Sequence, residues 1–102
     1  MTAPRPVPPL HAATRVRAAR DQVSCDVQGE VVILGLADGI YYGLDEVGAR
    51  VWSLMDTART VGELRDALTT EYQVDAATAE HDLRALLTEL VTRGLVDVDP
   101  AA

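Results

Sequence analysis

The sequence predicts a small α+β domain with winged helix-turn-helix order, in which a three-stranded antiparallel sheet packs on three helices. Two observations lead to this fold class. Strand-like runs occupy the first half of the chain and helix-like periodicity the second half, and the change follows Leu44 within about two residues. A chain of 102 residues is long enough for one such domain. We expect it to span residues 11–99, between a disordered, proline-rich arm at residues 1–10 and a tail at residues 100–102.

Three runs in the first half of the chain predict the strands. Residues 11–19 loosely alternate apolar and polar side chains, and residues 31–36 are an apolar, β-branched run. Residues 40–44 are expected to pair back onto that run through a tight turn at Asp38 and Gly39. Residues 20–30 are predicted to be a polar connection that turns at Gln28 and Gly29, in which residues 24–27 could form a further short strand.

The first two helices are predicted from their capping residues. Asp45 is a suitable N-cap for the first helix. The apolar stripe that follows, beside Trp52, consists of Val47, Val51, Leu54 and Met55. Thr60 and Glu63 have the spacing of a capping box at the start of the second helix, which should end near residue 72. Its predicted buried face consists of Val61, Leu64, Ala67 and Leu68.

The third helix has the clearest boundaries. Asp75 is its predicted N-cap and Gly94 its terminating residue. Its wide apolar stripe contains Ala79, Leu83, Leu86, Leu87, Leu90 and Val91. The alternating residues 95–98 are expected to lie on the core as an extended tail.

Charge and composition argue against several classes of function. The formal net charge is −7, and residues 45–102 carry twelve carboxylates and five arginines, which disfavours phosphates and anionic membranes as partners. A single cysteine excludes an intramolecular disulfide, and the absence of a long apolar run argues against a membrane span. The first ten residues do not resemble a secretory signal, so a cytoplasmic protein is expected.

No group of residues has the pattern of a catalytic or metal site. His11 and His81 fall in different predicted elements, and Cys25 has no activating neighbour. No glycine-rich loop precedes a helix, and neither serine has a base in its sequence context. We therefore expect a protein that is not an enzyme and that needs no metal or other cofactor.

Two segments carry a resemblance to a known family. Residues 39–45, GIYYGLD, and residues 48–56, GARVWSLMD, resemble the hallmark of the PqqD-like family. Residues 60–64, 71–75, 82–90 and 94–96 continue the pattern in register, so that the resemblance covers about residues 14–98. The sequence departs from it at Asp45, where Asn is common, and residues 25–30 are not recognisable. Members of this family recognise the leader peptides of ribosomally made, post-translationally modified peptides.

The resemblance implies a peptide-binding site at the edge of the third strand, against the third helix. There a precursor's leader would be added as a further strand. The residues expected to bind it are Ile40, Tyr41, Tyr42, Gly43, Leu44, Asp82, Leu83 and Leu86. Alternation along the strand places Ile40, Tyr42 and Leu44 on one face. The tyrosines and leucines would show the same spacing if they were only part of the core. The acidic residues Glu80, Asp82 and Glu89 could contact basic leader residues or could simply be solvated.

The composition of the chain, rich in Arg and Ala and without Lys, most resembles that of the stand-alone recognition proteins of lasso-peptide pathways. That type implies a leader peptidase of the cysteine-protease class and a cyclase as partners. The alternative is a protein that serves a radical SAM peptide-modifying enzyme. A winged-helix DNA-binding regulator is less favoured, because the third helix offers only Arg84 and Arg93 among several acids. A free sheet edge could also allow dimers.

Overall fold

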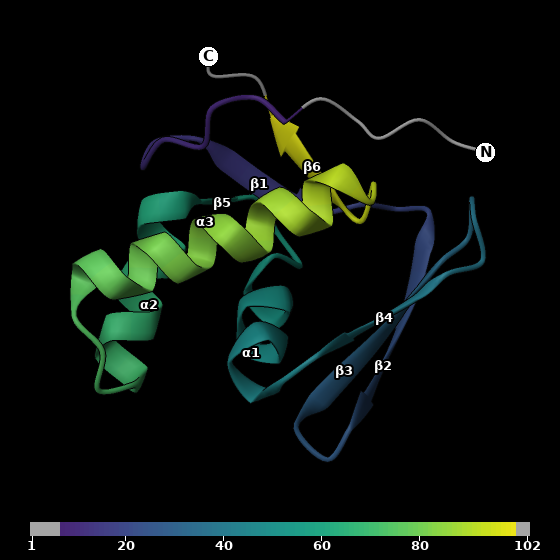
Figure 1. The fold of residues 1–102 in the computed structure, drawn as a ribbon, viewed down its shortest axis with the longest axis horizontal. Coiled ribbons are helices and arrows are strands. Elements are labelled where there is room, and N and C mark those ends of the chain that lie inside the picture. The colour runs from purple at the N-terminus through teal and green to yellow at the C-terminus, as the bar shows by residue number, and fades with distance from the viewer. Residues whose placement is uncertain (1–6, 100–102) are drawn as a thin grey trace.

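The computed structural model describes residues 7–99, which form three helices and two small antiparallel sheets (Figure 1). The elements are β1 (Arg15–Ala18), β2 (Gln22–Val27), β3 (Glu30–Gly35), β4 (Tyr41–Leu44), α1 (Glu46–Leu54), β5 (Arg59–Thr60), α2 (Val61–Glu71), α3 (Ala76–Thr92) and β6 (Val96–Asp99). One sheet has the order β2-β3-β4 and the other β5-β1-β6. The predicted α+β class, with three helices and a three-stranded antiparallel sheet, is confirmed.

The β2-β3-β4 sheet is built from two hairpins of different kinds. Val27 pairs with Glu30 across a two-residue turn in which Gln28 and Gly29 have φ of 54° and 85°, as a type I′ turn requires. The predicted tight turn at Asp38 and Gly39 is instead part of a longer connection.

Residues 36–40 form that connection between β3 and β4. The Gly35 amide donates to the Ile40 carbonyl at 3.1 Å, and the Gly39 amide donates to the Gly35 carbonyl at 2.8 Å. Gly39 has the left-handed φ of 70°, and an Asp38 carboxylate oxygen accepts from the Ile40 amide at 3.0 Å. The Asp side chain therefore stabilises a wider loop than the dipeptide predicts.

The prediction for residues 11–19 is wrong in its length and in its partners. Only Arg15–Ala18 form a strand, and β1 pairs with β5 and with β6 at the other end of the chain. The third strand of the larger sheet is β2, the segment predicted as mostly a connection. The predicted extended tail is the strand β6. Local alternation predicts that β1 is a strand but contains no information on which distant strand it joins.

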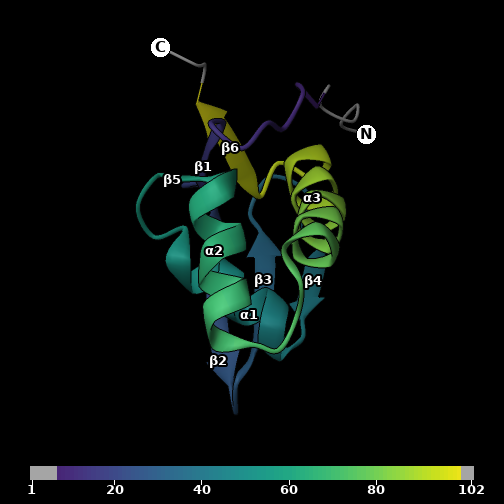
Figure 2. The same cartoon turned by 90° about the vertical axis from the view of Figure 1, so that its left-hand side faces the viewer.

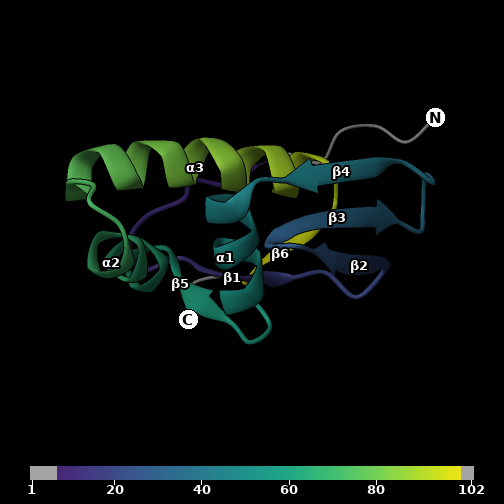
Figure 3. The same ribbon diagram turned by 90° about the horizontal axis from the view of Figure 1, so that it is seen from below.

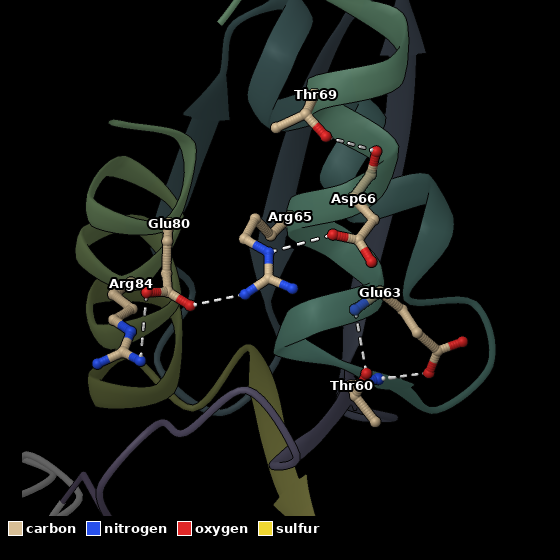
Figure 4. A network of polar contacts seen from close by, with 7 residues as sticks. All are labelled: Thr60, Glu63, Arg65, Asp66, Thr69, Glu80 and Arg84. Carbon is tan, nitrogen blue, oxygen red and sulfur yellow. Dashed lines mark hydrogen bonds and ion pairs between the residues drawn. The ribbon is translucent and has the colours of Figure 1, made fainter. Parts of the chain in front are cut away.

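The predicted caps are confirmed. The Gly48 amide donates to Asp45 at 2.9 Å, and the Thr78 amide donates to Asp75 at 2.7 Å. At the start of α2, Thr60 and Glu63 exchange hydrogen bonds of 2.9 and 3.0 Å as a capping box (Figure 4). Gly94 follows α3 with φ of 74°.

The core lies between the inner face of the β2-β3-β4 sheet and the three helices. Ile33, Met55, Leu87 and Leu90 are fully buried there. Leu10 is also buried, with 7% of its surface exposed, so the prediction of a disordered arm through residue 10 extends too far. Residues 1–6 of that arm and the tail at 100–102 lie outside the described residues.

Helix α3 runs in the opposite direction to the edge strand β4 when the fold is seen from below (Figure 3), and Arg93 of its C-terminal end contacts Tyr42 of that strand. Helix α2 lies on the other side of the N-terminal half of α3 (Figure 2). This arrangement places one face of α3 against β4 and α1, which is where the predicted site residues lie.

Candidate functional site

A groove of about 440 Å³ lies between β4, α1 and α3. It is lined by Tyr42, Gly43, Leu44, Asp45, Val47, Gly48, Val51, Leu68, Asp82, Leu83 and Leu86. The structure therefore brings together two segments that lie far apart in the chain, residues 42–44 and residues 82–86. Most of the predicted peptide-binding residues line this groove.

Ile40 and Tyr41 are the predicted residues whose side chains do not line it. Ile40 lies in the connection before β4, is 53% exposed, and lines a small separate hollow with Arg93 and Leu95. Tyr41 is 68% exposed and lies on the opposite face of the strand from Tyr42. Ile40 shares that hollow with Tyr42, in agreement with the common face predicted for Ile40, Tyr42 and Leu44, but it precedes β4 and does not line the groove.

Strand β4 is an open edge of its sheet, since only β3 pairs with it among the described residues. The bond from the Gly35 amide to the Ile40 carbonyl shows which pairs exchange hydrogen bonds. Bonded and non-bonded pairs alternate along an antiparallel ladder, so Tyr42 and Leu44 direct their backbone groups toward β3. Tyr41 and Gly43 consequently direct theirs away from the sheet, toward the groove side. No atom lies within 4 Å of a Cβ built on Gly43, so the face of the strand toward which that Cβ points is open at this position.

The floor of the groove is apolar. Val51, Leu68 and Leu83 are at most 4% exposed, whereas Leu86 is half-buried and Val47 is 42% exposed. Val47 belongs to the apolar stripe predicted for α1, and its exposure follows from its position at the groove. The width of the α3 stripe is the sequence signal for this floor. No such signal exists for Leu68, which enters from α2.

Negative charge predominates at one end of the groove. Asp45 and Asp82 are the charged residues in its lining. One oxygen of Asp45 accepts the Gly48 amide as the cap of α1. Asp82, which is exposed, forms no hydrogen bond or ion pair with any residue in the described part of the chain.

A stacked contact joins α3 to Tyr42, one of the residues that line the groove. The Arg93 guanidinium lies over the Tyr42 ring, 4.9 Å from the ring centroid, and its Nε donates to Glu89 at 2.9 Å. Partial burial, and then the negative charge of Glu89, raise the pKa of the Tyr42 hydroxyl, while Arg93 opposes that shift. The contact ties the C-terminal end of α3 to β4, so the two walls of the groove are joined there.

Within residues 7–99, no group of three or more His, Cys, Asp or Glu side chains could hold a metal ion. Cys25 is exposed on β2. None of the helices in the described range is long and apolar enough to cross a membrane.

Comparisons with known proteins agree with the resemblance noted in the sequence. A family described as coenzyme PQQ synthesis protein D (PqqD) matches residues 30–96. A solved structure, TbiB1 in complex with the TbiA(beta) leader peptide, is 40% identical with a TM-score of 0.74, and the match covers 84% of this chain and 98% of that one.

A second solved structure is similar in fold. Lasso peptide synthetase B1 complexed with the leader peptide has a TM-score of 0.72 at 24% identity, over 80% of this chain and 96% of that one. No curated protein sequence gave a significant match.

Proposed function

Because the chain belongs to the PqqD family, we propose that it is a leader-peptide recognition protein, which binds the leader of a ribosomally made precursor in lasso-peptide biosynthesis. The observation that carries this proposal is the open edge of β4 beside an apolar groove. TbiB1, which is 40% identical over most of its length, was solved with a leader peptide bound.

The leader would bind as an added strand. The outward backbone groups of Tyr41 and Gly43 offer hydrogen bonds to a peptide lying along β4, each with a net contribution of about 0.5–1.5 kcal/mol. Alternate side chains of such a strand would enter the groove and contact Val47, Leu83 and Leu86. The backbone hydrogen bonds of β4 would contribute part of the affinity, and the side chains that line the groove would determine which leader sequences bind.

The protein would then deliver the precursor to the enzymes that process it. Holding the leader keeps the rest of the precursor near a bound partner's active site, at an effective concentration that reaches about the millimolar range for a short flexible linker. The partners we propose are a leader peptidase of the cysteine-protease type and a cyclase. The chain itself would act without catalysis and without a cofactor, in the cytoplasm.

Two alternatives considered from the sequence receive different support. Service to a radical SAM peptide-modifying enzyme would use the same groove, and the 40% identity to TbiB1 favours the lasso pathway over it. DNA binding gains nothing from the structure, since Arg84 and Arg93 are both paired with carboxylates of α3.

Fluorescence anisotropy of a labelled leader tests the proposal. We would titrate fluorescein-labelled leader from the precursor encoded beside this chain, and the TbiA(beta) leader as a second probe, with the purified protein. Saturable binding that a scrambled peptide of the same composition does not show is expected. If circular dichroism shows a folded protein that binds neither leader, the proposed function is wrong.

A further inference from the structure

We propose that the groove selects its leader by charge, with Asp82 as the specificity-determining residue. This inference rests on the proposed function and names the class of peptide. The docked strand carries a basic side chain that meets Asp82, on the same face of the strand as an apolar anchor.

The acidic residues of α3 differ in whether their charge is neutralised. A carboxylate oxygen of Glu80 lies 3.2 Å from Arg65 and the other lies 3.7 Å from Arg84 (Figure 4). Glu89 is paired with Arg93 at 2.9 Å. Asp82, on the same helix, has no such partner among residues 7–99, and it is the one that lines the groove.

The surroundings strengthen the negative field of Asp82. The residues that line the groove include no arginine, and the other charged one, Asp45, is also acidic. The whole chain carries a formal net charge of −7. A cationic side chain entering the groove meets attraction from both carboxylates, whereas an acidic one meets repulsion from both.

The position of Asp82 also places the basic residue within the docked strand. Helix α3 runs in the opposite direction to β4 (Figure 3), and Arg93 after its last turn contacts Tyr42, so we place Asp82, in the first half of α3, toward the Leu44 end of the groove. Side chains on one face of a strand recur every second residue, about 6.5–7 Å apart. A basic residue at the Leu44 end therefore leaves the next groove-facing position beside Leu83 and Leu86 for an apolar side chain.

The expected effect is moderate because Asp82 is exposed at the rim of the groove. An ion pair between exposed groups is weakened by water and by salt. Selection by Asp82 would therefore change the affinity by a few-fold and would add to the larger contribution of the strand edge and the apolar floor.

A double-mutant cycle with synthetic peptides tests the inference. Each Lys and Arg of the leader is replaced singly by Gln, and each peptide is titrated with the wild-type protein and with Asp82→Asn. We expect Asp82→Asn to weaken binding of the unaltered leader about two- to fivefold in low salt, and one Gln peptide to be insensitive to it. The difference should shrink in about 0.5 M NaCl.

The matched control is Glu30→Gln, which removes one carboxylate from the exposed start of β3, away from the groove. It should leave the affinity unchanged. A charge-reversed pair, Asp82→Arg with Glu at the sensitive peptide position, should regain part of the lost affinity.

The outcomes separate the two proposals. If wild type and Asp82→Asn bind the leader and all its Gln variants alike, selection by Asp82 is wrong and leader recognition stands. If the folded wild-type protein binds no leader, the proposed function itself fails. Circular dichroism of each variant shows whether it is folded.

Discussion

Among residues 7–99, each outer strand of the β2-β3-β4 sheet is paired on one side only, and the groove described above lies along one of them, β4. The Leu36 amide donates to the Asp21 carbonyl at 3.1 Å, which sets the bonded pairs between β2 and β3. By the same alternation as in β4, Gln22, Ser24 and Asp26 direct their backbone groups outward. Each edge could therefore pair with an added strand through its main chain.

The side chains around the two edges differ. Strand β4 runs beside α3 and contributes Tyr42, Gly43 and Leu44 to the groove. Strand β2 is exposed along most of its length, and none of its residues line that groove. The comparison teaches that an open edge supplies hydrogen bonds to any strand, while the neighbouring helices decide which strand binds.

The largest difference should come from removing one outward amide at each edge. Gly43→Pro deletes a donor that faces the groove and adds a ring where a peptide would lie, so leader affinity should fall at least about tenfold. Ser24→Pro deletes an outward amide of β2 and should leave the affinity unchanged. Anisotropy titration measures both, and urea unfolding shows that each variant is folded. Equal affinities for the two variants would contradict strand addition at β4.

A smaller difference is expected from the groove floor. Leu86→Ala removes apolar surface that is half-buried in the groove, and it should weaken leader binding by about 1 kcal/mol, roughly fivefold. Leu36→Ala makes the same change at a side chain that is 56% exposed on the β3–β4 connection, and should have no effect on binding. A floor without a role in binding would give the two variants the same dissociation constant.

The contact that joins α3 to β4 should have a still smaller effect, on stability. Arg93→Ala removes both the stack on Tyr42 and the pair with Glu89, and should lower the free energy of unfolding by about 0.5–1 kcal/mol. Arg84→Ala breaks only a pair with Glu80 on the same helix. Pairs of this kind stabilise a helix by about 0.2–0.5 kcal/mol, so the loss of stability should not exceed that range. Urea unfolding compares them. If Arg84→Ala costs as much stability as Arg93→Ala, the stack does not hold the groove walls together.

The smallest effect concerns the pH dependence of stability at the start of α2, the helix that contributes Leu68 to the groove. Hydrogen bonds from the Thr60 backbone and side chain lower the pKa of Glu63 below its ordinary 4.5. A carboxyl whose pKa is lower in the folded state stabilises the fold above its ordinary pKa, and this stabilisation is lost as pH falls through the lowered value. The free energy of unfolding should therefore decrease below about pH 4.5.

The variant Glu63→Gln isolates this contribution. Gln can keep the hydrogen bonds of the capping box but does not titrate, so its stability should depend less on pH in that acidic range. Urea unfolding at several pH values between 3 and 7 measures the slope. Identical slopes for wild type and variant would assign the acid sensitivity to other carboxylates, such as Asp75 at the start of α3, whose pKa is also lowered, chiefly by the Thr78 amide.

What could be predicted from the sequence depended on local chemistry. The caps Asp45, Thr60 and Asp75 act within one turn of helix, so a few neighbouring residues reveal them. Most of the residues that line the groove could be predicted from the sequence. The apolar stripe of α3 is wider than a core requires, and the family resemblance indicated which strand lies near it.

What was missed depended on distant partners and on backbone geometry. The turn predicted at Gln28-Gly29 is confirmed and is the two-residue one, whereas Asp38-Gly39, predicted as a tight turn, belongs to a longer connection. The pairing of β1 with β6 joins residues about eighty positions apart, which no periodicity reports. Leu68 enters the groove only because α2 packs against α3, and its spacing shows no more than a buried position.

The pairing of β1 with β6 has a consequence for how the protein can be joined to others. It brings Arg15 opposite Asp99, so the early and late segments of the chain lie side by side in a sheet that contributes no residue to the groove. A further domain or a tether attached beyond either strand would therefore leave the β4 edge accessible. A tether that continues from β6 would start on the sheet that holds β1, apart from the strand that offers its edge to a peptide.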